Sequence, residues 1–119
     1  MKNREIKFRA WDSISTCYHY WRGIEHLPLK EFIELEHYTL EQCIGIKDKN
    51  GRYIYEGDIV SYYQPYAKRT DIHVVKWDDE WAGFGLFERD NIWCKESDWV
   101  KIMHIDVVGN IHANPELLK

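Results

Sequence analysis

Hydrophobic and polar residues alternate along much of this chain with the period of β-strands. Residues 5–10 place Ile6 and Phe8 between charged side chains, a pattern that predicts a half-buried strand. Residues 11–13 predict a turn, and the aromatic residues at 18–21 predict a second strand. The chain therefore opens with two predicted strands separated by a turn.

The later strand signals lie beyond residue 40. The predicted strands there are 42–46, 59–63, 72–77, 83–87 and 101–111. The segment 72–77 is rich in β-branched residues and is expected to be a central strand. Residues 91–98 show neither the two-residue period of a strand nor the period of a helix, and they are predicted to be irregular.

Helical signals are confined to two short segments. Pro28 suits the first position of a helix, and apolar residues at helical spacing follow it as far as Glu36. Near the end, Asn114 is a predicted N-cap and Pro115 a predicted first helical position. The sequence thus predicts a mainly β, β-rich α+β fold: a small antiparallel barrel or a strongly bent sheet, with one or two short helices.

A hairpin turn is predicted at Asn50 and Gly51. Asn-Gly is the strongest two-residue hairpin signal, because both central positions of a type I′ turn need positive φ. With these two residues as the loop, Asp48 is expected to face Tyr53 across the hairpin.

A second tight turn is predicted at Glu56, Gly57 and Asp58. Gly57 is expected at positive φ, a backbone region that a Cβ disfavours. The pattern Gly-Asp followed by Ile59 and Val60 is common in small SH3-like barrels. We therefore expect part of the fold to be SH3-like, which by itself says little about activity.

Length and composition predict one folded domain over residues 1–119. The apolar fraction is 45% and the aromatic fraction is 15%, the opposite of a disordered profile. A chain of 119 residues can bury a core without metal or disulfide support. Its three cysteines, Cys17, Cys43 and Cys94, are odd in number and widely spaced, which predicts free thiols in a reducing cytoplasm.

Net charge and hydropathy limit the classes of partner that the chain is expected to bind. The net charge is -4, and the basic stretches at 47–52 and 68–69 are short, so duplex DNA binding is not favoured. The first residues lack the apolar core of a secretory signal, and no apolar run approaches the roughly 20 residues of a membrane span. We expect a protein of the host-cell cytoplasm with no membrane association.

Three segments, taken in order, carry a resemblance. They are REIKFRAWD at 4–12, then GIKDKNG at 45–51 with IYEGDIV at 54–60, then VGNI at 108–111 with NPELL at 114–118. Together they resemble the YopX family of phage and prophage proteins. The resemblance implies a phage or prophage origin and a compact β-rich fold, and it supplies no catalytic residues.

The chain departs from the family pattern at four positions. Cys43 and Ile44 stand where such proteins often carry an aromatic residue and Thr. His112 and Ala113 stand where they often carry Tyr and Glu. No role is transferred from the family to these positions.

The sequence gives little support for a catalytic site. Asp48, Glu56 and Asp58 lie at the tight turns, where carboxylates on neighbouring loops could hold Mg²⁺ as in a metal-dependent hydrolase. Turn chemistry explains the same residues better, because Asp bonds local backbone amides. The spacing of His104 and Asp106 is typical of a surface pair. No catalytic, cofactor-binding or metal-binding residue is assigned.

The aromatic residues support two binding hypotheses. The candidate strip for stacking single-stranded nucleic acid comprises Tyr62, Tyr63, Tyr66, Lys68 and Arg69. Trp and Tyr are also enriched in protein interfaces. Because the chain is acidic, we favour a non-enzymatic accessory protein that binds a protein partner or itself, with nucleic-acid binding as the alternative.

Overall fold

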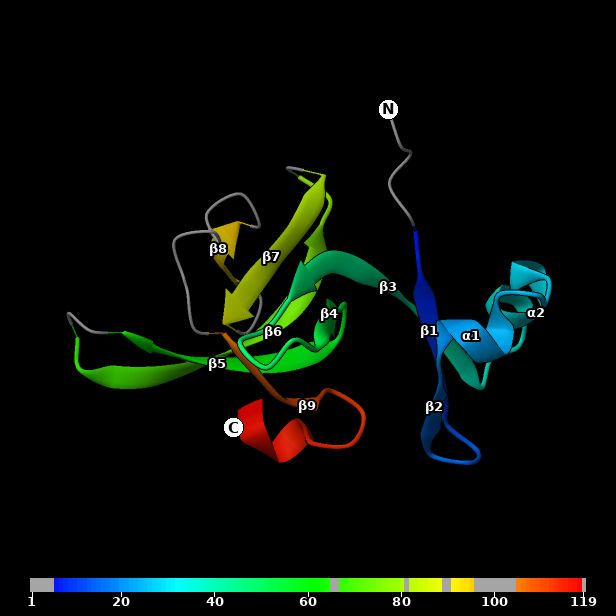
Figure 1. Cartoon of the computed structure of the whole chain (residues 1–119), viewed down its shortest axis with the longest axis horizontal. Helices are drawn as coiled ribbons and strands as arrows, with labels where there is room; N and C mark the ends of the chain where they lie inside the picture. The colour runs from blue at the N-terminus through cyan, green and yellow to red at the C-terminus, as the bar shows by residue number, and fades with distance from the viewer. Residues whose placement is uncertain (1–5, 65–66, 81, 89–90, 96–104, 119) are drawn as a thin grey trace.

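The computed structural model folds into two antiparallel β-sheets with two short α-helices (Figure 1). It describes residues 6–64, 67–80, 82–88, 91–95 and 105–118. The strands within these ranges are β1 Phe8–Asp12, β2 Cys17–His19, β3 Tyr38–Lys47, β4 Tyr53–Tyr55, β5 Asp58–Gln64, β6 Arg69–Asp78, β7 Gly83–Glu88, β8 Asn91–Lys95 and β9 Asp106–Asn110. The helices are α1 Trp21–Ile24, α2 Leu29–Glu34 and the 3-10 helix η2 Pro115–Leu118.

The first sheet has the order β2-β1-β3-β4. Together, β1, β2, α1, α2 and the first half of β3 form what we call the small lobe, on the right in Figure 1. Its core consists of the buried residues Ala10, Ile24 and Phe32, with Trp21, Tyr38 and Leu40 packed around them. Short helices of this kind depend on such packing, because they are too short to be stable alone.

The second sheet has the order β8-β7-β6-β5-β9, and we call it the large sheet. Its central strand β6 contains the predicted segment 72–77, as expected. Nine buried residues form its core: Ile44, Ile54, Val60, Tyr62, Val75, Phe84, Leu86, Ile105 and Val107.

The ten-residue strand β3 joins the small lobe to the large sheet. Its first half pairs with β1, whereas its second half pairs with β4. Gly45 has φ +84, and the β3–β4 register shifts between Cys43 and Lys47. The shift bends the strand, so that Ile44 packs into the core of the large sheet. The expectation of a mainly β fold with a strongly bent sheet and short helices is confirmed.

The predicted boundaries near the start of the chain are partly wrong. Trp11 and Asp12 pair with Thr39 and Tyr38, so they continue β1 instead of forming a turn. The turn lies at 13–16, where Asp12 accepts hydrogen bonds from the backbone amides of residues 14 and 15. Long-range pairing with β3 decides this boundary, and local sequence does not report it.

The predicted hairpin register is also wrong. Lys47, not Asp48, faces Tyr53. Asp48 turns its carboxylate into the loop and accepts hydrogen bonds from the backbone amides of Asn50 and Arg52, both at 2.9 Å. Satisfying these amides makes the connection longer than a two-residue turn.

The last third of the chain differs from its prediction at one strand. Residues 91–95 form the edge strand β8, where an irregular segment was expected, because β7 provides a pairing partner. The predicted strand at 101–111 is present as β9 from residue 106 to 110, and residues 101–104 lie outside the described ranges. No helix in the described ranges is long and apolar enough to span a bilayer.

Candidate functional site

A buried ionic cluster lies where the small lobe meets the large sheet. We define it as Arg9 of β1, Tyr18 of β2, Glu41 of β3, Asp58 of β5 and His112 after β9. Arg9, Glu41 and Asp58 are 4%, 2% and 2% exposed. Buried charges of this kind are tolerated when they are paired and hydrogen-bonded.

Arg9 is the centre of this ionic cluster. Its Nε donates to Glu41 Oε1 at 2.9 Å, and its Nη2 donates to Asp58 Oδ1 at 2.8 Å. The guanidinium carbon lies 3.9 Å from the centre of the Tyr18 ring and 4.6 Å from that of Tyr55. Two carboxylates and two π faces therefore compensate one desolvated cation.

Glu41 is fully engaged on both carboxylate oxygens. Oε1 also accepts a hydrogen bond from the Tyr18 hydroxyl at 2.9 Å. Oε2 lies 2.9 Å from His112 Nε2, and the imidazole ring stacks on Trp11 with centroids 4.8 Å apart. The side chain thereby connects β2, β3 and the segment after β9.

Gly57 makes room for this carboxylate. A Cβ at residue 57 would lie 2.4 Å from Glu41 Oε2, and the residue has φ +88. The expected positive φ is confirmed, and the close approach gives a second reason for glycine. The Gly57 amide also donates to the carbonyl of Val75 in β6, at 2.8 Å.

Burial controls the ionisation of this region. Desolvation raises the pKa of Asp58, and it outweighs the opposing effects of Arg9 and of the Tyr55 amide. Desolvation likewise raises the pKa of the nearby Glu56 and of the Tyr18 hydroxyl. The pKa of Arg9 is raised: burial lowers it, but the charges of Asp58 and Glu41 outweigh burial.

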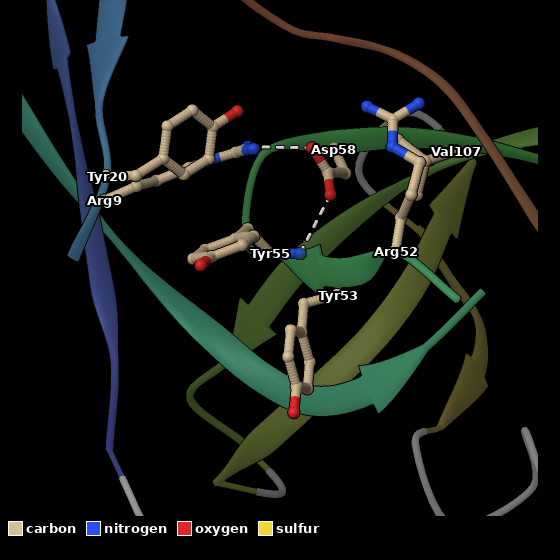
Figure 2. A pocket seen from close by; sticks show the side chains of 7 residues that line it. All are labelled: Arg9, Tyr20, Arg52, Tyr53, Tyr55, Asp58 and Val107. Atoms are coloured by element: carbon tan, nitrogen blue, oxygen red, sulfur yellow. Dashed lines mark hydrogen bonds and ion pairs between the residues drawn. The ribbon is translucent and has the colours of Figure 1, made fainter. Parts of the chain in front are cut away.

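A pocket with a volume of about 380 Å³ opens beside this ionic cluster (Figure 2). Its lining residues are Arg9, Tyr20, Arg52, Tyr53, Tyr55, Asp58 and Val107. Figure 2 shows Tyr20 and Arg52 on opposite sides, with Asp58 between them and Tyr53 below. Four of the lining residues are buried and form the floor, whereas Tyr20, Arg52 and Tyr53 are exposed and form the rim.

The ionic cluster and the pocket bring together the three sequence segments that resemble YopX motifs. Arg9 belongs to the first segment, and Tyr55 and Asp58 belong to the second. In the third, the Asn110 side chain accepts a hydrogen bond from the His112 amide. Residues 24–119 match the YopX protein family. This chain belongs to the YopX family.

A solved structure has a similar fold. The crystal structure of protein EF1440 from Enterococcus faecalis matches this YopX-family chain with a TM-score of 0.68 and 28% sequence identity. The match covers 98% of this chain and 100% of that chain. No curated protein matches this chain.

The turn residues predicted at the first hairpin of this YopX-family chain serve to anchor β9. Besides the loop amides, Asp48 accepts a hydrogen bond from the Val107 amide at 3.2 Å. Asn50 donates to Asp106 at 3.0 Å, and Gly51 adopts φ +82. Burial acts to raise the pKa of Asp48, but the three backbone amides outweigh it and hold the pKa below its ordinary value.

The turn residues predicted near the C-terminus stabilise the segment after β9. Asn114 Oδ1 accepts from the Asn110 amide at 3.2 Å and occupies the space that a Cβ on Gly109 would need. Asn114 therefore bonds back toward β9, whereas an N-cap would bond its own helix. Pro115 begins the 3-10 helix η2, as its first-position prediction requires.

The carboxylates of the metal-hydrolase hypothesis are engaged elsewhere. Asp48 binds loop amides, Asp58 binds Arg9 and the Tyr55 amide, and Glu56 accepts from the Gln42 amide at 3.1 Å. No group of three metal-ligating side chains occurs in the described part of the chain. The structure does not bring these three carboxylates together as a metal site.

The predicted nucleic-acid strip is not continuous. Tyr62 is 6% exposed in the core, whereas Tyr63 is 54% exposed, because adjacent strand residues point to opposite faces. Arg69 forms an ion pair with Asp71 at 3.0 Å, Lys68 is exposed at φ +52, and Tyr66 lies outside the described ranges. The proposal of Tyr62 as a stacking residue is therefore wrong.

Several residues of the site were missed by sequence reasoning. Glu41 lies directly before the predicted strand 42–46, and nothing local marks it as an ionic partner of Arg9. Tyr18 and Tyr20 carried an aromatic signal, but their roles depend on the fold. His112 was given no role by the sequence, and its contact with Glu41 arises only in the fold.

Proposed function

We propose that this YopX-family protein is a non-enzymatic phage or prophage accessory protein that acts by binding a protein partner or a second copy of itself. The supporting observation is the surface of the small lobe. Five of the twelve exposed large hydrophobic side chains in the described ranges fall between residues 14 and 35: Ile14, Tyr20, Leu27, Ile33 and Leu35.

The small lobe buries few apolar side chains in its core and leaves several large ones exposed. Within α2 and the residue after it, Phe32 is 5% exposed, but Ile33 is 70% and Leu35 is 46% exposed. Ile14, in the β1–β2 turn, is 76% exposed. Single exposed apolar residues are ordinary, whereas a contiguous exposed apolar patch is typical of an interaction surface.

The ionic cluster also favours binding over catalysis. Its central groups are held by one another: Arg9 contacts Glu41, Asp58 and the carbonyl of Glu56, and Glu41 contacts Arg9, Tyr18 and His112. Groups engaged in this way position the two sheets and have little capacity left for proton transfer to a substrate. This arrangement supports a scaffold that presents surfaces.

Light scattering and a pull-down from host lysate test the proposal on three proteins: the native chain, a double variant and a single-variant control. The double variant Ile14→Ser/Ile33→Ser removes aliphatic side chains from the small lobe, and Ile72→Ser removes one from the large sheet, where it is 39% exposed. We expect self-association or a retained partner to be lost in the double variant and kept in Ile72→Ser. A strictly monomeric native protein that retains no partner would refute the proposal.

A further inference from the structure

We propose that Asn50 is a site of spontaneous deamidation, and that this modification releases the 48–52 loop, which joins β3 to β4, from β9. The inference goes beyond the proposed function and holds whether or not a partner binds. It is carried by the Asn50-Gly51 pair, by the hydrogen bond that tethers Asn50 to Asp106, and by the contacts through which the same loop covers the free edge of β9.

The reaction needs only the loop and water. The backbone nitrogen of Gly51 loses its proton and attacks Cγ of Asn50. A bond forms between these two atoms, the bond from Cγ to Nδ2 breaks, and Nδ2 leaves as ammonia with that proton. Water then opens the resulting succinimide ring at either carbonyl carbon. The products are aspartate, or isoaspartate in which the backbone runs through the side chain, with water consumed and ammonia released.

The position of this pair in the loop favours the reaction. Asn50 and Gly51 are both exposed, so water reaches them. The space that a Cβ on Gly51 would occupy is open, with no atom of a non-neighbouring residue within 4 Å. Glycine leaves its own nitrogen unhindered and gives the backbone the freedom to bring that nitrogen toward Cγ.

The other asparagines in the described ranges are less suited to this reaction. Asn91 and Asn110 each precede an isoleucine, whose β-branched side chain crowds the nitrogen that would attack. Asn114 precedes Pro115, which has no amide proton to lose. Among these asparagines, Asn50 is therefore the favoured position.

Two hydrogen bonds oppose the reaction while the loop is closed. Asn50 Nδ2 donates to Asp106 Oδ1 at 3.0 Å, which fixes the side chain that must turn toward the backbone. The Gly51 amide donates to the carbonyl of Asp48 at 3.0 Å, which engages the proton that must be lost. The rate therefore depends on how often the loop opens. Loss of the Asp106 carboxylate should raise this rate.

The same loop covers the outer edge of β9. The Lys49 amide donates to the carbonyl of Ile105 at 2.9 Å. The Val107 amide donates to Asp48 Oδ2 at 3.2 Å. Because β9 is the last strand in the order of the large sheet, these bonds occupy backbone groups that have no partner strand. Unpaired groups at a sheet edge are a template for pairing with another chain, so the loop protects β9.

Deamidation reverses the polarity of the tether. It replaces the donor group of Asn50 by a carboxylate that faces the carboxylate of Asp106, and like charges placed opposite each other are destabilising. Lys49 Nζ lies 3.7 Å from Asp106 Oδ2, and the new carboxylate competes with Asp106 for this cation. The loop is expected to detach from β9, so that the amides of Lys49 and Val107 lose their hydrogen bonds.

Incubation of the native protein at mildly alkaline pH, followed by peptide mass spectrometry, tests the site. Alkaline pH favours loss of the Gly51 proton. The peptide that contains Asn50 should gain the mass of a converted amide several-fold faster than the peptide that contains Asn110. Asp106→Ala should accelerate the conversion at Asn50. Asp79→Ala, the same substitution at an exposed position of the β6–β7 hairpin, is the matched control and should leave the rate unchanged.

Conversion at Asn50 that is no faster than at Asn110 would overturn the proposal. Equal rates in Asp106→Ala and Asp79→Ala would overturn the role of the tether, because a specific restraint on Asn50 would then be absent. Circular dichroism checks that both variants remain folded, and the comparison within the native protein does not depend on either of them.

A second pair of variants tests the release of β9. Asn50→Asp mimics the aspartate product, whereas Asn50→Ala removes the same hydrogen bond without adding a charge, at a position without a positive φ. Asn50→Asp should have the lower midpoint of thermal denaturation, and the difference should narrow as salt is added. The amides of Lys49 and Val107 should exchange faster in Asn50→Asp. Equal midpoints and equal exchange in the two variants would overturn the release.

Discussion

The large sheet and the small lobe are stabilised in different ways. Nine buried residues form the core of the large sheet, whereas three form that of the small lobe. Where the two meet, Arg9, Glu41 and Asp58 supply charge pairs instead of apolar packing. Apolar burial is non-directional, but ion pairs and cation–π contacts fix orientation. The comparison indicates that packing stabilises one sheet and directional contacts hold the other against it.

The largest effect is expected at Glu41. Glu41→Ala leaves Arg9 buried without one of its two carboxylate partners, and it removes the contacts of Glu41 with Tyr18 and His112. It should therefore lower the free energy of unfolding by about 3–5 kcal/mol. Glu41→Gln keeps an acceptor oxygen and should lose clearly less. Urea denaturation measures both. Equal losses would show that the negative charge, and not the shape or the acceptor oxygen, is what the residue supplies.

Substitutions that create a cavity should have different effects in the two hydrophobic cores. Leu86→Ala removes a fully buried side chain from the large sheet and should cost about 2–5 kcal/mol. Ile24→Ala in the small lobe should cost less, because a smaller core collapses more readily around the gap. Amide hydrogen exchange should show that Ile24→Ala loosens β1 and β2 while β5 and β6 stay protected. Uniform loosening of all strands would contradict the comparison.

Substitution of Gly57 tests the junction between the small lobe and the large sheet. Gly57→Ala places a Cβ at positive φ, which costs about 1–2 kcal/mol, and it displaces the Glu41 carboxylate as well. In a Glu41→Ala background the second cost should vanish, leaving the backbone cost alone. A double-mutant cycle by thermal denaturation measures the difference. An unchanged or raised midpoint for Gly57→Ala would mean that the glycine is not structurally required.

The half-buried Glu56 should make stability depend on pH. Desolvation raises its pKa above the ordinary value of 4.5, so the folded state holds its proton more tightly than the unfolded state. Its contribution is therefore full below about pH 4.5 and is lost as pH rises through the folded-state pKa. Glu56→Gln should remove this decline and equal or exceed the native stability at neutral pH.

Urea denaturation at a series of pH values measures this effect. Glu31→Gln, which removes an exposed carboxylate from α2, is the control for net charge. A native protein whose stability relative to Glu56→Gln rises with pH over the same range would have the opposite sign and would contradict the assignment.

The smallest effect is expected in the hairpin between β6 and β7. Ala82 has φ +56, a region that favours glycine. Ala82→Gly should raise the free energy of unfolding by about 1 kcal/mol, because the relief of backbone strain exceeds the added entropy of the unfolded chain. Calorimetry of this variant beside Ala67→Gly, an exposed position without a positive φ, separates strain relief from a general effect of glycine.

The sequence by itself determined the class of fold and most of its strands. Period-two alternation marked β1 and β9, β-branched residues marked β6, and Gly57 marked a turn with positive φ, because these signals are local. The same locality explains the errors. Residues 11–12 and 91–95 became strand because β3 and β7 offered partners that no local pattern reports.

Tertiary structure alone decided the site. Arg9 and Glu41 are 32 residues apart, and Arg9 and Asp58 are 49 apart, so no spacing in the chain announces their contact. The pocket likewise depends on the bend of β3, which places Tyr20 of the small lobe beside Tyr55 at the large sheet. A charge in a strand pattern looks the same whether it faces water or a buried partner. That distinction arises when two sheets close over it and remove the solvent that would otherwise stabilise it.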